Sequence, residues 1–132
     1  MNIEKHLERL KESLQLIDES ITRGVSQRQR TIGFNVSAAS ADMFEIFLHQ
    51  EKLVDPGFIV KHEWFKSKHK KLEKFPFDFN GKEKILQLMT SVEEARDPLC
   101  YGTPKSEQHI QKVIEQFNQL KKLFKENGVN VE

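Results

Sequence analysis

Apolar residues recur at alternating steps of four and three from the start of the chain. They are Ile3, Leu7, Leu10, Leu14, Ile17 and Ile21, and mostly charged or amide side chains fill the gaps. Helical residues three or four positions apart share one face, so this spacing predicts an amphipathic helix whose apolar stripe needs a partner. Similar stripes continue along the chain and no strand pair is evident, so the predicted fold is an all-α, antiparallel up-and-down bundle of four to five helices.

Later segments repeat this helical period and are separated by turn residues. Further helices are predicted from near Ser26, after Asp55-Pro56-Gly57, over Lys82 to Ala95, and from Thr103-Pro104. The helix after Gly57 is expected to carry these residues on one face: Phe58, His62, Phe65, His69 and Leu72. Small residues around the second of these helices let a neighbouring helix approach closely. The run KFPFDFNG, 74–81, predicts a loop whose phenylalanines close one end of the bundle. Proline disfavours helical geometry in the residue before it, so Pro98 is expected to end the fourth helix.

Length and charge limit the classes of protein that this chain can belong to. A chain of 132 residues fits one domain, predicted as a single bundle over 1–127 followed by a frayed tail over 128–132. The net charge is +1, so any site for a polyanion must be local. The single cysteine excludes an intramolecular disulfide and a cysteine-rich zinc site. No signal-like or membrane-spanning segment is evident, so a cytoplasmic protein without membrane association is expected.

The stretch EEARDPLCYG, 93–102, is poorly explained by packing alone. It places Arg96 and Asp97 directly before a proline and Tyr101 shortly after it. A guanidinium binds phosphate through its planar fork, and Glu93, one helical turn earlier, is spaced to orient that of Arg96. A salt bridge at the end of a helix is the alternative interpretation of the same residues.

Three segments resemble archaeal stand-alone members of the HEPN superfamily, the higher eukaryotes and prokaryotes nucleotide-binding domains. They are IGFNVSAASADMFEIFLHQEKLVDPG, HEWF and KEKILQLMTSVEEARDPLCYG. Members of that family resemble one another in an arginine, commonly followed by a polar residue, with a histidine four to six residues after the arginine. Arg96 and Asp97 match this motif, whereas Tyr101 stands where the histidine is expected. The resemblance implies a homodimer that brings two motifs together and cleaves RNA without a metal ion or other cofactor.

The resemblance makes Arg96, Asp97 and Tyr101 the candidate catalytic residues. Histidine transfers protons near neutral pH, but tyrosine, with an ordinary pKa of about 10, is poorly suited to this role. Arg96, Glu93, His62 and His69 are the candidate substrate-binding residues, and either histidine is a candidate to replace the missing base. Histidines with structural hydrogen bonds are the alternative, and a zinc pair is disfavoured because helical zinc ligands usually stand three or four apart.

Three functions are consistent with these features. The first is a HEPN-like protein that binds nucleotide or RNA phosphate, with metal-independent endoribonuclease activity of the toxin–antitoxin or defence type as its enzymatic form. The second is a non-catalytic interaction module that pairs with a minimal nucleotidyltransferase, as the resemblance also implies. The third is a helical scaffold without a ligand. The lysine run at 66–74 predicts either a phosphate-binding patch or a solvated helix face.

Overall fold

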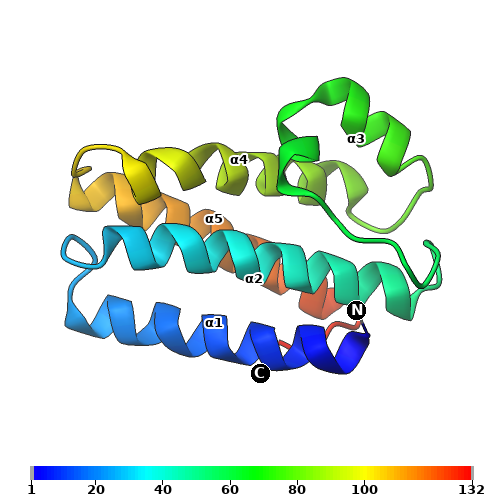
Figure 1. The fold of residues 1–132 in the computed structure, drawn as a ribbon, viewed down its shortest axis with the longest axis horizontal. Helices are drawn as coiled ribbons and strands as arrows, with labels where there is room; N and C mark the ends of the chain where they lie inside the picture. The colour runs from blue at the N-terminus through cyan, green and yellow to red at the C-terminus, as the bar shows by residue number, and fades with distance from the viewer. Residues whose placement is uncertain (1, 132) are drawn as a thin grey trace.

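The computed structural model describes residues 2–131 as a bundle of helices. The elements are α1 (Ile3–Arg23), α2 (Gln29–Gln50), the 3₁₀ helix η1 (His62–Lys66), α3 (Lys68–Lys74), α4 (Lys82–Tyr101) and α5 (Glu107–Glu126). The four long helices alternate in direction, and short α3 projects from the bundle (Figure 1). No strand occurs between residues 2 and 131. The predicted all-α class is therefore confirmed.

Helix ends follow the capping chemistry of their flanking residues. The side chain of Asn2 accepts a hydrogen bond from the Lys5 amide at the start of α1, and Gly24 ends that helix with a positive φ of 121°. Helix α5 starts after Ser106, whose hydroxyl accepts from the His109 amide, rather than at the predicted Thr103-Pro104. The stronger cap therefore lies three residues further along the chain than expected.

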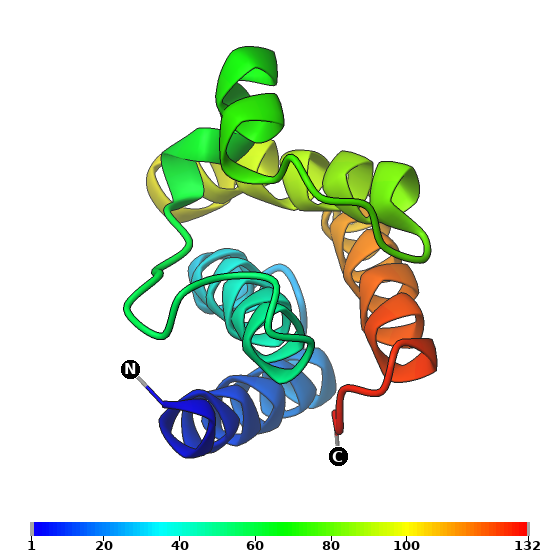
Figure 2. The ribbon, with the colours of Figure 1, turned by 90° about the vertical axis from the view of Figure 1, so that its right-hand side faces the viewer.

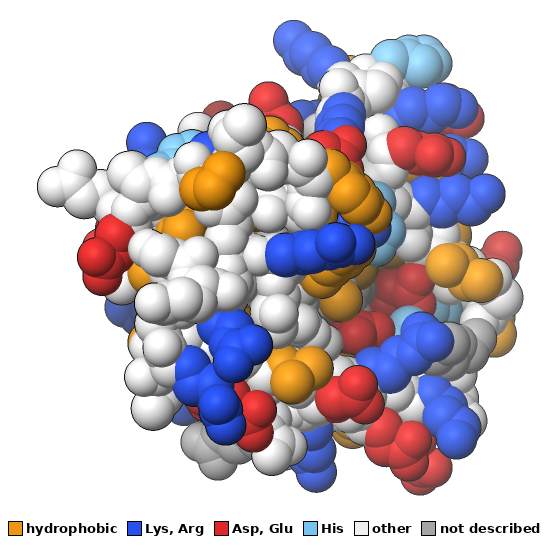
Figure 3. All heavy atoms as spheres, turned by 60° about the vertical axis from the view of Figure 1, so that its left-hand side comes forward, with side chains coloured by type: hydrophobic (Ala, Val, Ile, Leu, Met, Phe, Trp, Pro, Cys, Tyr) orange, Lys and Arg blue, Asp and Glu red, His pale blue; other side chains and the backbone are white. Residues whose placement is uncertain are grey.

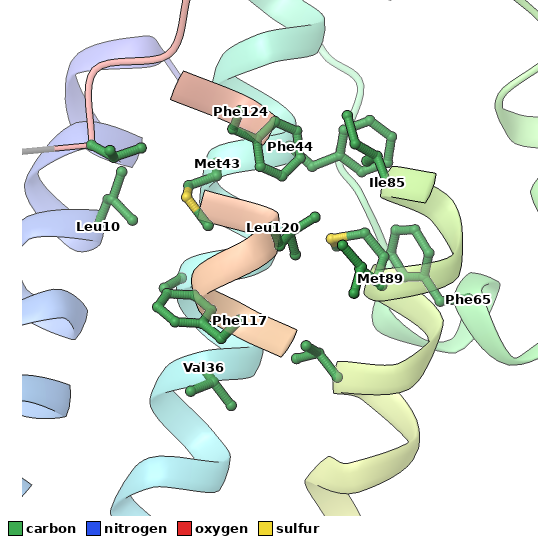
Figure 4. Packing of buried hydrophobic residues seen from close by; sticks show 14 of the residues in the cluster. Leu10, Val36, Met43, Phe44, Phe65, Ile85, Met89, Phe117, Leu120 and Phe124 are labelled. Atoms are coloured by element: carbon green, nitrogen blue, oxygen red, sulfur yellow. The ribbon is translucent and has the colours of Figure 1, made fainter. Parts of the chain in front are cut away.

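Helix α2 forms the centre of the bundle and contacts α1, α4 and α5 (Figure 2). Fourteen of its 22 residues are buried, so it lacks the clean polar face of α1 and α5. Figure 4 shows Phe44 of α2 packed beside Phe124 of α5. Ile85 and Met89 of α4 lie on the other side of Phe44 from α5. Burial of such side chains stabilises a fold by roughly 1.5–3 kcal/mol each, so this central layer contributes strongly to the hydrophobic stabilisation.

Gly33 allows α2 and α4 to pack closely where they cross. A Cβ atom at this position would lie 2.7 Å from Cβ of Leu99 and 3.0 Å from Sγ of Cys100. Only a residue without a side chain fits this contact. The prediction that small residues of the second helix admit a close neighbour is confirmed at Gly33, and the neighbour is the end of α4.

The prediction that Pro98 ends the fourth helix is wrong. Helix α4 continues through Pro98 to Tyr101. Proline removes only one backbone hydrogen bond here, and the burial of Leu99 and Cys100 against α2 favours continued helical geometry. The amide of Gly102 then donates to the carbonyl of Pro98 and closes the last turn. Arg96 therefore lies within a helix and not at a broken joint.

The prediction of one continuous third helix after Asp55-Pro56-Gly57 is also wrong. Helix α2 ends at Gln50, and an irregular segment leads to η1 and α3. Side chains of α2 hold this segment: the Val60 amide donates to the Glu45 carboxylate, and His49 donates to the carbonyl of Phe58 at 3.1 Å. These bonds satisfy backbone groups that a helix would otherwise pair internally.

The loop at 75–81 and the last described residues both pack against the bundle. The ring of Phe75 lies 4.9 Å from that of Phe44, so the predicted closure of the bundle end is confirmed. The expected fraying after residue 127 is wrong for 128–131, because Val129 and Val131 are buried. No helix among the described residues is long and apolar enough to cross a bilayer.

Gln29 clamps the end of α4 and the connection to α5, which generates a prediction for stability. Its side-chain amide donates to the carbonyls of Leu99 and Thr103 at 3.2 and 3.1 Å and accepts from the Lys105 amide at 2.7 Å. Gln29→Ala leaves these three backbone groups without that partner, so it should lower the free energy of unfolding by about 2 kcal/mol or more.

Urea denaturation measures this loss. The control is Gln15→Ala, which removes an exposed glutamine of α1 and should change stability by less than about 0.5 kcal/mol. Equal stability of the two variants would contradict the assigned role of Gln29.

Candidate functional site

Arg96 lies on α4, with about a third of its side chain exposed. Its guanidinium carbon is 5.3 Å from the centre of the Phe34 ring on α2, and Nη1 is 3.5 Å from Oδ1 of Asp97. The Asp97 side chain is more than half exposed, and exposed ion pairs contribute only about 0–1 kcal/mol. The guanidinium is therefore held in place by Phe34 but remains available to an external anion.

A second guanidinium, from Arg30, contacts the same Phe34 ring and also that of Tyr101. It lies 5.6 Å from the centre of the Phe34 ring and 5.6 Å from that of Tyr101. The two rings meet edge to face at 5.8 Å, and 65% of Tyr101 is exposed. We call Arg30, Phe34, Arg96 and Tyr101 the arginine–aromatic patch. Phe34 was missed by the sequence analysis, although its spacing of four from Arg30 places both residues on one helix face.

Asp97 and Cys100, beside this patch, have different roles from Arg96. Lys66 of η1 contacts the second carboxylate oxygen of Asp97 at 3.3 Å, so Asp97 links two cations. Burial raises the pKa of the Cys100 thiol, and the nearby charges of Arg96 and Arg30 only partly oppose this shift. The thiol therefore stays protonated near neutral pH and is not an activated nucleophile.

Glu93 and His62 form a carboxylate–imidazole pair between α4 and η1. Nδ1 of His62 lies 2.7 Å from Oε1 and 2.9 Å from Oε2 of Glu93. The Glu93 side chain is 3% exposed and that of His62 is 43% exposed. The hydroxyl of Ser37 on α2 also donates to Glu93. The predicted contact of Glu93 with Arg96 is therefore replaced by two hydrogen bonds, while Arg96 acts on the carboxylate through its charge.

The Glu93 carboxylate is ionised despite being buried. Burial is the largest single influence and raises its pKa. Hydrogen bonds from His62 and Ser37, with the charges of His62 and Arg96, act in the opposite direction. Together they outweigh burial and hold the pKa of Glu93 below its ordinary value of 4.5.

The structure separates the two predicted histidines. His69 lies on α3 with 85% of its side chain exposed, and its nearest carboxylate, Glu73, is 3.5 Å away in the same helix. His62 belongs to η1 and contacts Glu93 of α4, so the two histidines lie on different elements and have different partners. The lysine run is partly engaged as well, since Lys71 donates to Thr90 and Lys74 lies 5.0 Å from the centre of the Trp64 ring.

A second buried histidine, His6 of α1, lies between two carboxylates of α2. Nδ1 of His6 is 2.8 Å from Asp42 and Nε2 is 2.6 Å from Glu45, and all three side chains are buried. Sequence analysis missed this cluster. The sequence signal for it was a pair of carboxylates, Asp42 and Glu45, three positions apart among the apolar residues of α2. His6 stands beside the apolar stripe of α1.

Only the Asp42 side of this cluster is hydrogen-bonded, because Nε2 of His6 and Oε2 of Glu45 are both buried and have no hydrogen-bond partner among the described residues. A neutral imidazole has one N–H group, yet both nitrogens of His6 face carboxylate oxygens. Burial raises the pKa of Asp42, and the hydrogen bond from His6 with the charges of His6 and Arg9 only partly reverses that shift.

A groove of about 530 Å³ separates the two histidine clusters and has both on its walls. It runs between α1, α2 and the segment that leads into η1, over a floor that includes Ala38 and Ala41. Figure 3 shows acidic and histidine side chains gathered around a hollow on the right of that view, with basic side chains at its edge. Among residues 2–131, no group of three or more candidate ligands could hold a metal ion. The groove thus offers proton-transfer groups and Arg9 as an anion contact.

No protein-family model matches the chain, and no curated protein or solved structure matches it significantly.

The opposite pKa shifts of Glu93 and Asp42 predict opposite effects on acid stability. The pKa of Glu93 is lowered, so its ionised form contributes stability above pH 4.5 that is lost as pH falls through the folded-state value. The pKa of Asp42 is raised, so its contribution is present below pH 3.8 and is lost as pH rises through the folded-state value. Glu93→Gln should therefore reduce the loss of stability on acidification, and Asp42→Asn should enlarge it.

Urea denaturation over about pH 3 to 7 measures both slopes. The two variants serve as controls for each other, since each removes one buried carboxylate of similar exposure. Parallel pH profiles for wild type and both variants would contradict the assigned shifts.

Proposed function

We propose that this chain is a HEPN-like protein that binds the phosphate groups of a nucleotide or of single-stranded RNA at the arginine–aromatic patch. The observation that carries the proposal is that Arg30 and Arg96 both contact Phe34, beside the exposed ring of Tyr101. Guanidinium groups bind phosphate through two parallel hydrogen bonds, and exposed aromatic rings stack on bases. The patch thus presents both kinds of contact that a nucleotide needs.

Local charge supports an anionic ligand although the whole chain is nearly neutral. Arg96 and Lys66 both contact one exposed carboxylate, that of Asp97, and Arg30 lies over the same Phe34 ring as Arg96. Glu93 is already hydrogen-bonded below the surface. An arriving phosphate can replace Asp97 as the partner of Arg96, because an exposed ion pair holds that contact only weakly. The roles proposed here are phosphate binding for Arg96, exchange of ion pairs for Asp97 and base stacking for Tyr101.

Non-catalytic pairing with a minimal nucleotidyltransferase is the second candidate function. It is favoured by the tyrosine at 101, which is exposed on the surface and stands where the family motif has its catalytic histidine. In this alternative the patch is a protein contact and the chain binds no RNA. The resemblance further suggests a homodimer with two Arg96 side chains at its interface. Sedimentation of the purified protein tests whether it is a dimer.

Fluorescence anisotropy tests phosphate binding with two probes, a labelled oligouridylate and a fluorescent ATP analogue. The expected result is saturable binding of at least one probe that weakens with rising salt. Arg96→Ala and Arg30→Ala should each weaken binding about tenfold or more, because each removes a charge-assisted contact. Tyr101→Ala should weaken binding as well, since it removes the stacking surface.

Arg23→Ala is the matched control, because it removes an exposed arginine at the end of α1 and should leave affinity unchanged. The two probes distinguish RNA from free nucleotide as the source of the phosphate. Binding of neither probe, or equal binding by wild type, Arg96→Ala and Arg30→Ala, would overturn the proposed function.

A further inference from the structure

We propose that His62 is the general base of an RNA-cleaving site in the groove and that buried Glu93 positions it. This inference rests on the proposed function, since it requires RNA held at the arginine–aromatic patch. It assigns proton transfer to a residue of η1 within the same chain, 34 residues before Arg96 in the sequence, and to neither Tyr101 nor a partner subunit.

The hydrogen bonds of His62 leave one nitrogen available for chemistry. Glu93 and Ser37 both lie against Nδ1, at 2.7 and 3.2 Å. An ionised carboxylate only accepts hydrogen bonds, so the neutral form of His62 carries its proton on Nδ1 and a lone pair on Nε2. No described residue is hydrogen-bonded to Nε2, and His62 lines the groove. This is the arrangement that a general base requires, with one nitrogen held by a carboxylate and the other open to a ligand.

Glu93 is built to position the imidazole and cannot itself reach a substrate. Its side chain is 3% exposed, and its oxygens accept from His62 and Ser37. A surface ion pair would fix the ring weakly, whereas a buried charged acceptor fixes both its orientation and its tautomer. Burial therefore distinguishes His62 from His69, whose only described carboxylate partner, Glu73, is on the surface.

The base lies beside the proposed phosphate-binding group. Arg96 follows Glu93 by three residues on α4, and Phe34 precedes Ser37 by three residues on α2. One turn of each helix therefore supports the guanidinium, and the adjacent turn supports the imidazole. The other charged groups facing the groove are His6, Arg9, Glu12, Asp42 and Glu45. Among these Arg9 is a second contact for phosphate oxygens.

The proposed step is cleavage by the ribose 2′-hydroxyl. Nε2 of His62 takes the proton of that hydroxyl, the 2′-oxygen forms a bond to the adjacent phosphorus, and the bond from phosphorus to the 5′-oxygen breaks. The leaving 5′-oxygen takes a proton from water, and His62 returns its proton to solvent. The products are a 2′,3′-cyclic phosphate and a 5′-hydroxyl, with no oxidation, reduction or co-reactant other than water.

Cleavage of a labelled oligoribonucleotide tests this assignment, and the same oligomer with a 2′-deoxy group at every position is the substrate control. The wild type should cleave only the ribose form. His62→Gln should lower the cleavage rate about 100-fold or more while binding at the patch is unchanged. His69→Gln, which changes an exposed histidine of α3, should retain the wild-type rate.

The outcomes separate this inference from the proposed function. Binding without cleavage by wild type, or cleavage that survives His62→Gln, would overturn the inference and leave phosphate binding intact. Failure to bind RNA while the ATP analogue still binds would also overturn this inference alone, and failure to bind either probe would overturn the proposed function itself.

A spectroscopic measurement keeps the test informative if a variant is unstable. Nitrogen-15 chemical shifts should show that neutral His62 carries its proton on Nδ1 in the wild type. Glu93→Gln should lower the cleavage rate, shift its pH profile and reduce the fraction of this tautomer. A neutral His62 protonated on Nε2 in the wild type would overturn the role of Glu93.

Discussion

The central constraint on this protein is the burial of polar side chains on α2. A helix enclosed by three others must either be apolar throughout or supply a partner for each polar group, because an unpaired buried group costs about 1–3 kcal/mol. Gln29, Ser37, Asp42 and Glu45 are all buried on this helix. Each reaches a different part of the chain: the α4–α5 connection, the Glu93–His62 pair, His6 of α1, and the segment before η1. These bonds set where the non-helical segments lie.

The same helix supports both parts of the proposed site. Arg30 and Phe34 of α2 form one half of the arginine–aromatic patch, and Asp42 and Glu45 stand on the wall of the groove. Within this site the Glu93 carboxylate is buried beneath His62, whereas Arg30 is exposed and Arg96 is about a third exposed. Buried acceptors fix the orientation of their donors, and exposed cations stay free to exchange partners.

Helix periodicity predicted the long helices because apolar side chains are repeated there at helical spacing over several turns. It failed where side chains from another element satisfy the backbone. The segment around Phe58 and Val60 has a helical apolar pattern, yet His49 and Glu45 take its hydrogen bonds. Pro98 predicts the end of a helix, yet packing of Leu99 and Cys100 against Gly33 favours continuation of α4. Local preferences, which reach about 3 kcal/mol for a proline inside a helix, yield to such contacts.

The sequence by itself determined the all-α class, the approximate helix ranges and the spacing of Glu93 and Arg96 on one helix face. These features depend on neighbours within one or two helical turns. Only the tertiary structure decided that His62 lies on Glu93 and His69 does not, and that His6 meets Asp42 and Glu45 across 36 and 39 positions. Such pairs depend on how helices cross, and no local pattern records the crossing. A buried carboxylate fixes the orientation of its histidine, and burial arises only when the helices pack together.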